Sequence, residues 1–279
     1  MTYKVADLDE TTWKTNNMYD HFSRIAAQYQ ELRTTDLEPI SFMVRKLNGL
    51  SYIKAVDVGC GDGRYNRILC RYLGDKMNLT CVDVNAAMLD VLHKNLTEDG
   101  IRNFKTMQAS ADDLPLPDNS HDCVFTLNAI HHFDLSKFIR ESARILKNNG
   151  YLFAYTRLRE QNKKNIWGRY FPGFCRKETR LYTLNQMVKT INAVPGMRVQ
   201  SVEYFRYRRL STLPELEKRV RSYHYSTFFL YPLDELEKAI DKFKKNIMRA
   251  FEDVQGIHWY DENILVVVRK GNDNVYDLE

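Results

Sequence analysis

The chain has 279 residues, of which 44% are hydrophobic and 28% charged, and its net charge is +5 at pH 7. This length and composition exclude a disordered or fibrous protein and predict one globular domain with a sizeable core. The positive charge is mild and falls mainly after residue 156. It is typical of a solvated surface, with an anionic substrate or RNA as the alternatives.

Cysteine usage and the N-terminus bear on the compartment. The five cysteines are scattered, with no C-x-x-C pair, which predicts reduced thiols and no metal site. The N-terminal stretch MTYKVADLDE is polar and acidic, unlike a signal peptide, and no apolar run is long enough to cross a bilayer. We therefore expect a cytoplasmic protein without a membrane span.

The first half of the chain alternates between helical and strand-like apolar spacing. A helix is expected from Met18 to Leu32, in front of the first strand. The elements expected after it are a strand at 53–58, a helix at 64–73, a strand at 79–84, a helix capped by Asn85, strands at 104–109 and 123–127, a helix from Asp134 to about 146 and a strand at 151–155. This alternation predicts a parallel sheet with helices on both faces.

The last third departs from this rhythm. We expect a helix at 184–191, a strand at 198–204, two helices and a final strand at 264–268. The fold class is therefore α/β, a doubly wound and mostly parallel seven-stranded sheet, with a helical insertion at 211–258 over the carboxyl edge of the sheet. Within the single domain, 1–50 is a helical cap, 51–156 a cofactor-binding core and 157–279 a substrate-side half.

The stretch VDVGCGDG, at the end of the first strand, has glycines at alternate positions. In a doubly wound sheet, a glycine-rich first turn lets the backbone approach a ligand beyond the carboxyl ends of the strands. A dinucleotide site would prefer G-x-G-x-x-G, but position 64 is arginine. Asp83, at the end of the second strand, stands about where an acidic residue would take the hydroxyls of a ribose. The pattern predicts a nucleotide-like cofactor other than NAD.

Several ordered motifs between residues 18 and 156 resemble the class I S-adenosylmethionine-dependent methyltransferases, in particular the ubiquinone/menaquinone-biosynthesis type. VDVGCGDG is similar to the first motif of that fold and CVDVNAAML to its second. ADDLPLPDNSHDCV is similar to the loop and fourth strand, and HHF followed by RILKNNGYLFAY to the end of the core. The resemblance implies a Rossmann-like methyltransferase that uses S-adenosyl-L-methionine and releases S-adenosyl-L-homocysteine.

The resemblance also implies roles for individual positions. Asp57 and the backbone of Gly59, Gly61 and Gly63 would lie along the methionine moiety, and Asp83 would hold the ribose hydroxyls. The other residues implied at the cofactor are Val84 and Met88 beside adenine, Ser110, Ala111 and Asp112 near its amino group, and Asn128. Ser110 stands where the family often has an acidic residue, so that contact falls to Asp112 or is lost.

Upstream, FSRIAAQYQELR resembles the helix that folds over the cofactor. Tyr29 and Arg33 are one helical turn apart and would close on the methionine carboxylate, because arginine meets a carboxylate with two parallel hydrogen bonds. The alternative is an exposed helix face.

Two groups of residues are candidates for the methyl acceptor. His131 and His132 follow the fourth strand and would act as a general base, or hold the loop. Trp167, Tyr170, Phe171 and Phe174 would form a wall of the acceptor pocket, or pack as core. Nearby arginines favour a planar or anionic small molecule, reached by in-line displacement at the methyl group.

Two other functions share the cofactor. Aromatic and basic residues also suit RNA, and the HHF and AYTRLREQ segments look somewhat like the wobble-uridine tRNA methyltransferases. A non-catalytic protein that binds S-adenosylmethionine is the third alternative. The intact glycines and Asp83 argue against it.

Overall fold

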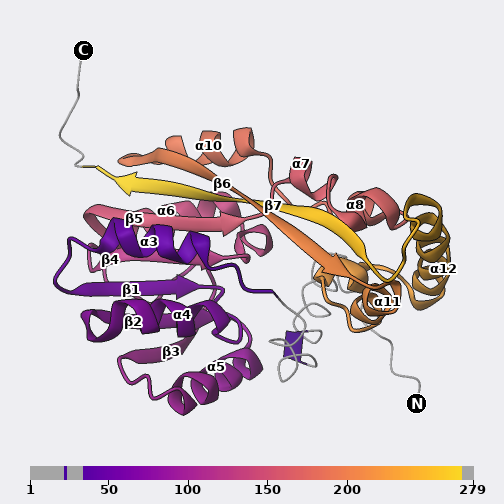
Figure 1. Cartoon of the computed structure of the whole chain (residues 1–279). Coiled ribbons are helices and arrows are strands. Elements are labelled where there is room, and N and C mark those ends of the chain that lie inside the picture. The colour runs from indigo at the N-terminus through magenta and orange to yellow at the C-terminus, as the bar shows by residue number, and fades with distance from the viewer. Residues whose placement is uncertain (1–21, 24–33, 272–279) are drawn as a thin grey trace, which may run out of the picture.

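The computed structural model describes residues 22–23 and 34–271, which are built around one seven-stranded sheet (Figure 1). The strands are β1 (Ile53–Val58), β2 (Met77–Asp83), β3 (Phe104–Gln108), β4 (His121–Leu127), β5 (Leu146–Thr156), β6 (Met197–Ser211) and β7 (Ile257–Lys270). Their order is β3-β2-β1-β4-β5-β7-β6. The first five strands are parallel, whereas β7 runs antiparallel to both of its neighbours. The predicted fold class is confirmed.

Helices cover both faces of the sheet. One face carries α3 (Glu38–Leu47), α4 (Arg64–Leu73) and α5 (Ala86–Glu98), and the other carries α6 (Leu135–Ile145) and α10 (Leu184–Asn192). Two short helices occur in the connections along the chain: η2 (Gly74–Lys76) precedes β2, and η3 (Ile130–His132) follows β4. Two helices begin where a side-chain cap was expected: the side chains of Asn85 and Asp134 accept hydrogen bonds from the first turns of α5 and α6.

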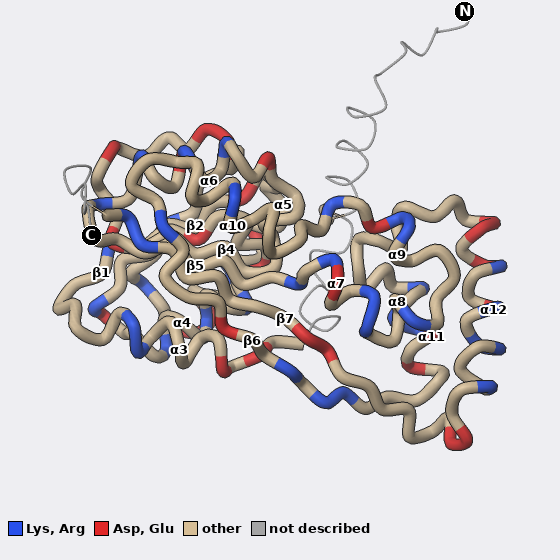
Figure 2. Tube along the Cα trace, turned by 90° about the horizontal axis from the view of Figure 1, so that it is seen from above, with Lys and Arg blue, Asp and Glu red and all other residues tan. Residues whose placement is uncertain are grey.

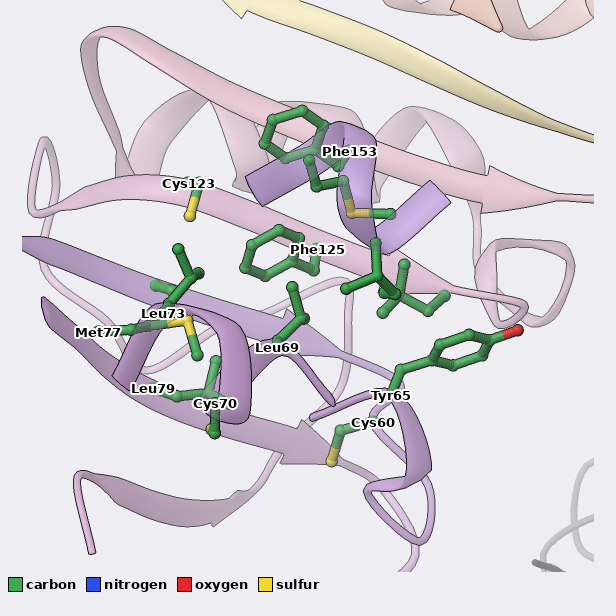
Figure 3. Close-up of a cluster of buried hydrophobic side chains, with 14 of the residues drawn as sticks. Cys60, Tyr65, Leu69, Cys70, Leu73, Met77, Leu79, Cys123, Phe125 and Phe153 are labelled. Atoms are coloured by element: carbon green, nitrogen blue, oxygen red, sulfur yellow. The ribbon is translucent and has the colours of Figure 1, made fainter. Parts of the chain in front are cut away.

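Each face of the sheet has its own hydrophobic core. On the α4 side, Leu69 and Leu73 pack against Phe125 and Phe153, whose rings stack 5.6 Å apart between centroids (Figure 3). On the other face, Phe138 of α6 and Met187 of α10 belong to a cluster with buried valines of the strands. These two buried layers fix the carboxyl ends of β1, β2 and β4 side by side, which is the edge where the glycine turn lies.

The strands β6 and β7 extend past the rest of the sheet as a two-stranded ribbon (Figure 1). Their predicted bounds, 198–204 and 264–268, were too short. Side chains along β6 alternate between half-buried and exposed, and the polar positions of the ribbon lack the continuous apolar run by which buried strands are recognised. The predicted helical insertion at 211–258 is present, with its first and last residues belonging to the strands.

The ribbon ends in a group of helices that we call the helical lobe. It comprises α7 (Arg159–Asn162), α8 (Ile166–Tyr170), α9 (Phe174–Lys177), α11 (Leu213–Arg221), η4 (Ser226–Leu230) and α12 (Leu233–Ala250). A third hydrophobic cluster, with Trp167, Phe228 and Phe243 at its centre, holds the lobe together. Both basic and acidic residues lie along its outer helix α12 (Figure 2). Within the described ranges, no helix is both long and apolar enough to span a membrane.

Candidate active site

The turn after β1 carries three glycines in left-handed backbone. Gly59, Gly61 and Gly63 have φ angles of +74°, +55° and +79°. A Cβ on Gly59 would lie 2.4 Å from Ala129 Cβ, and one on Gly63 would lie 2.7 Å from Leu92 Cγ, so both positions need glycine for packing. A Cβ on Gly61 would meet no atom within 4 Å. Gly61 therefore exposes bare backbone to open space, where a ligand can approach closely.

Asp57, near the end of β1, is a buried carboxyl group that is only partly satisfied. Its Oδ2 accepts a hydrogen bond from Asn66 Nδ2 at 2.9 Å, whereas Oδ1 has no partner among the described residues. Burial raises the pKa of Asp57 to about 8; the Asn66 hydrogen bond opposes the rise and the charge of Asp83 adds to it. A buried acceptor beside the glycine turn fits a ligand that brings an N–H donor.

Asp83, at the end of β2, ties the turn to the next helix. Its Oδ2 accepts a hydrogen bond from Gly61 N at 2.9 Å, and its Oδ1 accepts one from Asn85 N at 2.9 Å. Burial raises the pKa of this carboxyl group, while the backbone hydrogen bonds oppose the rise. Each carboxylate oxygen has a second lone pair, so Asp83 can hold the turn and still accept from a ligand hydroxyl.

The residues expected beside adenine lie at the carboxyl ends of β2 and β3, which are neighbours in the sheet. Val84 is 52% exposed, an aliphatic side chain open at the sheet edge. Met88 and Ala111 are buried. Ser110 is exposed and its Oγ accepts a hydrogen bond from Asp112 N at 3.2 Å, so the two polar candidates form one small turn. The residues after β2 and the residues after β3 thus lie at the same edge of the sheet as the glycine turn.

The loop after β4 lies next to that turn. Asn128 has a left-handed φ of +62°, and its Nδ2 donates to Tyr65 Oη at 3.1 Å. His131 and His132 follow in η3, with ring centroids 4.1 Å apart. The His132 ring also meets Phe22 edge-on at 5.6 Å, which brings the N-terminal segment to the site at that residue. The predicted Tyr29 and Arg33 lie outside the described residues.

A cavity of about 110 Å³ lies between this loop and the helical lobe. From the sheet side it is lined by Tyr65, Asn128, His131 and His132, among others. From the lobe it is lined by Trp167, Phe174, Arg219, His224 and Tyr225, among others. The cavity is comparable to the ~150 Å³ space that holds a single benzene ring in a protein core.

The four aromatic residues predicted for the acceptor pocket divide between two places. Trp167 and Phe174 line the cavity, although each is only 2% exposed. Phe171 packs between Trp167 and Phe243 within the third cluster, and Tyr170 packs against Phe251. Only two of the four therefore reach the cavity, and both also serve the core of the lobe.

An ion-pair network forms one side of the cavity and was not foreseen from the sequence. Asp261 accepts from Arg209 Nε at 3.3 Å and pairs with Arg157 Nη2 at 3.1 Å. Arg209 Nη2 reaches Asp36 Oδ1 at 2.6 Å, and Tyr155 Oη donates to Asp36 Oδ2 at 2.9 Å. The members of this network are spread over the chain from residue 36 to residue 261, so no local sequence pattern connects them. The available signals were the basic stretches FRYRR, which contains Arg209, and AYTRLREQ, which contains Arg157.

Comparison with known proteins identifies the core. Residues 56–154 match the family described as "Methyltransferase domain". The uncharacterized methyltransferase YcgJ of Bacillus subtilis is 30% identical over 131 residues, which are 46% of this chain and 51% of YcgJ. The ubiquinone/menaquinone biosynthesis C-methyltransferase UbiE of Hahella chejuensis is 28% identical over 150 residues, 51% of this chain and 60% of UbiE. The alignments thus span only about half the length of these curated relatives.

Solved structures agree on the fold. The crystal structure of YcgJ superposes with a TM-score of 0.61 at 18% identity and covers 85% of this chain and 100% of that one. Geranyl diphosphate C-methyltransferase from Streptomyces coelicolor, solved with S-adenosyl-L-homocysteine, has a TM-score of 0.51 at 14% identity and covers 82% of this chain and 76% of that one. Residues 56–154 thus match a methyltransferase domain family in sequence, the solved structures share the fold, and the resemblance noted from the motifs is confirmed.

Proposed function

We propose that this protein is an S-adenosylmethionine-dependent methyltransferase that acts on a small molecule. The observation that carries the proposal is Gly61, a left-handed glycine with open space where its Cβ would be, held by the Asp83 carboxylate. A tight turn alone explains Gly59 and Gly63 but leaves Gly61 without a packing reason. The buried and unsatisfied Oδ1 of Asp57 lies on the strand that feeds the same turn.

The residues present fit the cofactor. Asp57 and the turn backbone would hold its amino-acid part, Asp83 its ribose, and Val84, Met88 and the 110–112 turn its adenine, with Asn128 beside the methionine part. S-adenosyl-L-methionine supplies, when bound, a methyl group on a sulfonium that is already activated for displacement. The chain itself must then align the acceptor, exclude water and, where the acceptor carries a proton, take that proton.

The cavity beside Asn128 and Tyr65 is the proposed acceptor site. Its walls come from both the sheet edge and the helical lobe, so an acceptor there would be enclosed on both sides. His131 and His132 line it, and an imidazole near neutral pH is able to accept a proton. Trp167 and Phe174 add a small area of ring edge to its lining.

Binding of the cofactor product tests the first part of the proposal. Calorimetry with the full chain should show binding of S-adenosyl-L-homocysteine and none of NAD. Asp83→Ala should weaken that binding by about 1–3 kcal/mol, because ligand hydroxyls lose their buried partner. Asp90→Ala, at an exposed position of α5, is the control and should bind normally. Tight binding of NAD, or no binding of the sulfur compound, would overturn the proposal.

The acceptor class needs a separate experiment. Labelled S-adenosyl-L-methionine is incubated with the protein and a fractionated cell extract, and label is expected in the low-mass fraction. Label in tRNA would support the wobble-uridine alternative, which also predicts tRNA affinity that falls steeply with salt as counterions are released. Binding of the cofactor without transfer to any fraction would support the non-catalytic alternative.

A further inference from the structure

The geometry points to an acceptor that carries an anionic group, recognised by Arg219 of α11. This inference rests on the proposed function and deepens it by naming the chemical class of the substrate. The group is a carboxylate or a phosphate attached to a body about the size of one ring, as the cavity volume of about 110 Å³ suggests. Arg219, on α11 of the helical lobe, lines the cavity together with His131.

The other arginines of the cavity wall already have partners. Arg157 and Arg209 share Asp261, and Arg209 also pairs with Asp36. Arg64 Nη1 donates to the Thr34 carbonyl oxygen at 2.7 Å, and its guanidinium lies 4.5 Å from the Tyr65 ring centroid. Arg157 and Arg209 therefore have carboxylate partners, and Arg64 is held by a carbonyl oxygen and a ring.

Besides Asp36 and Asp261, the cavity is lined by one more carboxylate, Glu178, which also has partners. Glu178 is 5% exposed and pairs with Arg180, whose Nε lies 2.9 Å from Glu178 Oε1. Thr227 Oγ1 donates to the other oxygen of Glu178 at 2.5 Å. Glu178 therefore has no free charge to offer to Arg219.

Arg219 differs from these arginines, because its side chain has no hydrogen-bonded or salt-bridged partner among the described residues. Across the part of the chain that the structure describes, no carboxylate lies within 4.0 Å of its guanidinium and its side chain makes no hydrogen bond. Glu215, one helical turn earlier, instead accepts from Ser211 Oγ at 2.7 Å and Thr212 N at 3.0 Å. Glu217 is held by Arg221 and Lys244. A half-buried guanidinium in this position favours a bidentate carboxylate or phosphate.

The backbone after α11 adds a second group to the same wall. Tyr223 adopts a left-handed φ of +50°, which is rare for a bulky side chain. The following His224 donates its backbone N–H to the Arg219 carbonyl oxygen at 2.9 Å and is a buried part of the cavity lining. The helix end thus brings Arg219 and His224 to one cavity, which Trp167 and Phe174 also line.

Matched ring compounds test the inference. Benzoate and its neutral analogue benzamide are titrated into the full chain saturated with S-adenosyl-L-homocysteine, and phenyl phosphate against phenol forms the second arm. Binding is followed by calorimetry and by the fluorescence of Trp167 and Trp259, which both line the cavity. We expect at least one anion to bind about tenfold tighter than its neutral analogue. The preferred arm tells a carboxylate from a phosphate.

Variants of α11 test whether Arg219 causes the preference for the anion over its neutral analogue. Arg219→Gln should reduce the anion preference to about one, and Arg219→Lys should retain part of it. Arg221→Gln, on the same helix but paired with Glu217 and Glu237 outside the cavity, should match the wild type. No anion preference in the wild type, or an unchanged preference in Arg219→Gln, would overturn the inference. If S-adenosyl-L-homocysteine itself does not bind, the proposed function fails instead.

Discussion

At the scale of single residues, Gly61 differs from Gly59 and Gly63 because packing does not require a glycine there. Gly61→Ala should cost about 1–2 kcal/mol of unfolding free energy, the penalty for a side chain in left-handed backbone, because no neighbouring atom is struck. The new methyl group would enter the space that a ligand needs, so affinity for S-adenosyl-L-homocysteine should fall by about tenfold or more. Urea denaturation and calorimetry measure the two effects.

Gly100 provides the matched control. It also has a left-handed φ, of +75°, and open space at its Cβ position, but it lies at the far end of α5. Gly100→Ala should show a similar loss of stability with normal affinity. Equal ligand affinity in both variants would mean that Gly61 does not face the cofactor.

Asp57 predicts a pH dependence of stability. Its folded-state pKa is raised by burial to about 8, whereas an unfolded aspartate ionises near pH ~4. Its contribution is fully present below the unfolded pKa and is lost as pH rises through the folded one. Between those limits the unfolded chain binds fewer protons, so stability should fall by up to about 1.4 kcal/mol per pH unit.

Asp57→Asn tests this by removing the titrating group and keeping its shape. Unfolding in urea is measured at intervals from pH 5 to pH 8 for both proteins. The wild type should lose stability with rising pH more steeply than the variant. Parallel curves would show that Asp57 ionises normally in the folded protein.

At the scale of elements, the start of α5 links helix stability to the site. Asn85 Oδ1 accepts a hydrogen bond from Met88 N at 3.1 Å, and its Nδ2 donates to Ser23 Oγ at 2.9 Å. Asn85→Ala should cost about 1 kcal/mol of unfolding free energy through the lost cap. Because the first turn of α5 also carries Met88, affinity for S-adenosyl-L-homocysteine should fall several-fold.

Asp134 is the matched control, because it caps a helix on the opposite face of the sheet. It caps α6 through a hydrogen bond from Lys137 N at 3.0 Å. Asp134→Ala should lose a similar amount of stability in chemical denaturation and keep its ligand affinity in calorimetry. A normal affinity in Asn85→Ala would argue that the cap stabilises the helix only.

The elements that could be predicted from the sequence were those with strong local signals. The strand β1 and the helices α4, α5 and α6 were found within a few residues. A short, mainly apolar stretch marks β1, Gly74 marks the end of α4, and Asn85 and Asp134 mark the starts of α5 and α6. The ends of β6 and β7 were missed since the ribbon leaves the sheet and carries exposed charges such as Arg206 and Arg208. Local patterns do not show how far two strands continue to pair.

The candidate site divides in the same way. The glycine turn and Asp83 were predicted because each lies in a short motif at the end of a predicted strand, VDVGCGDG and CVDVNAAML. The acceptor side was predicted only as a group of aromatic residues, of which Trp167 and Phe174 reach the cavity. Asp36 and Asp261 could not be predicted, because a salt bridge between elements that far apart leaves no trace in either segment.

At the scale of the whole molecule, the Asp36–Arg209–Asp261–Arg157 network joins the chain before α3 to the ends of β5, β6 and β7. Asp261 lies at its centre and accepts hydrogen bonds or ion pairs from Arg209, Arg157 and Trp259. Its side chain is 11% exposed, so water replaces little of what is lost with the charge. Removing one partner of a buried pair leaves the others uncompensated.

Asp261→Asn should therefore lower the unfolding free energy by about 3–5 kcal/mol, as found when a buried ion pair is broken. Glu262→Gln is the adjacent control: its pairs with Lys164 at 3.3 Å and Arg206 at 3.9 Å involve largely exposed basic side chains, and the loss should be below about 1 kcal/mol. Urea denaturation followed by tryptophan fluorescence measures both. In Asp261→Asn the native spectrum should also change, because Trp259 Nε1 lies 3.3 Å from Asp261 Oδ1. Equal losses in the two variants would show that the network does not hold the ribbon and the core together.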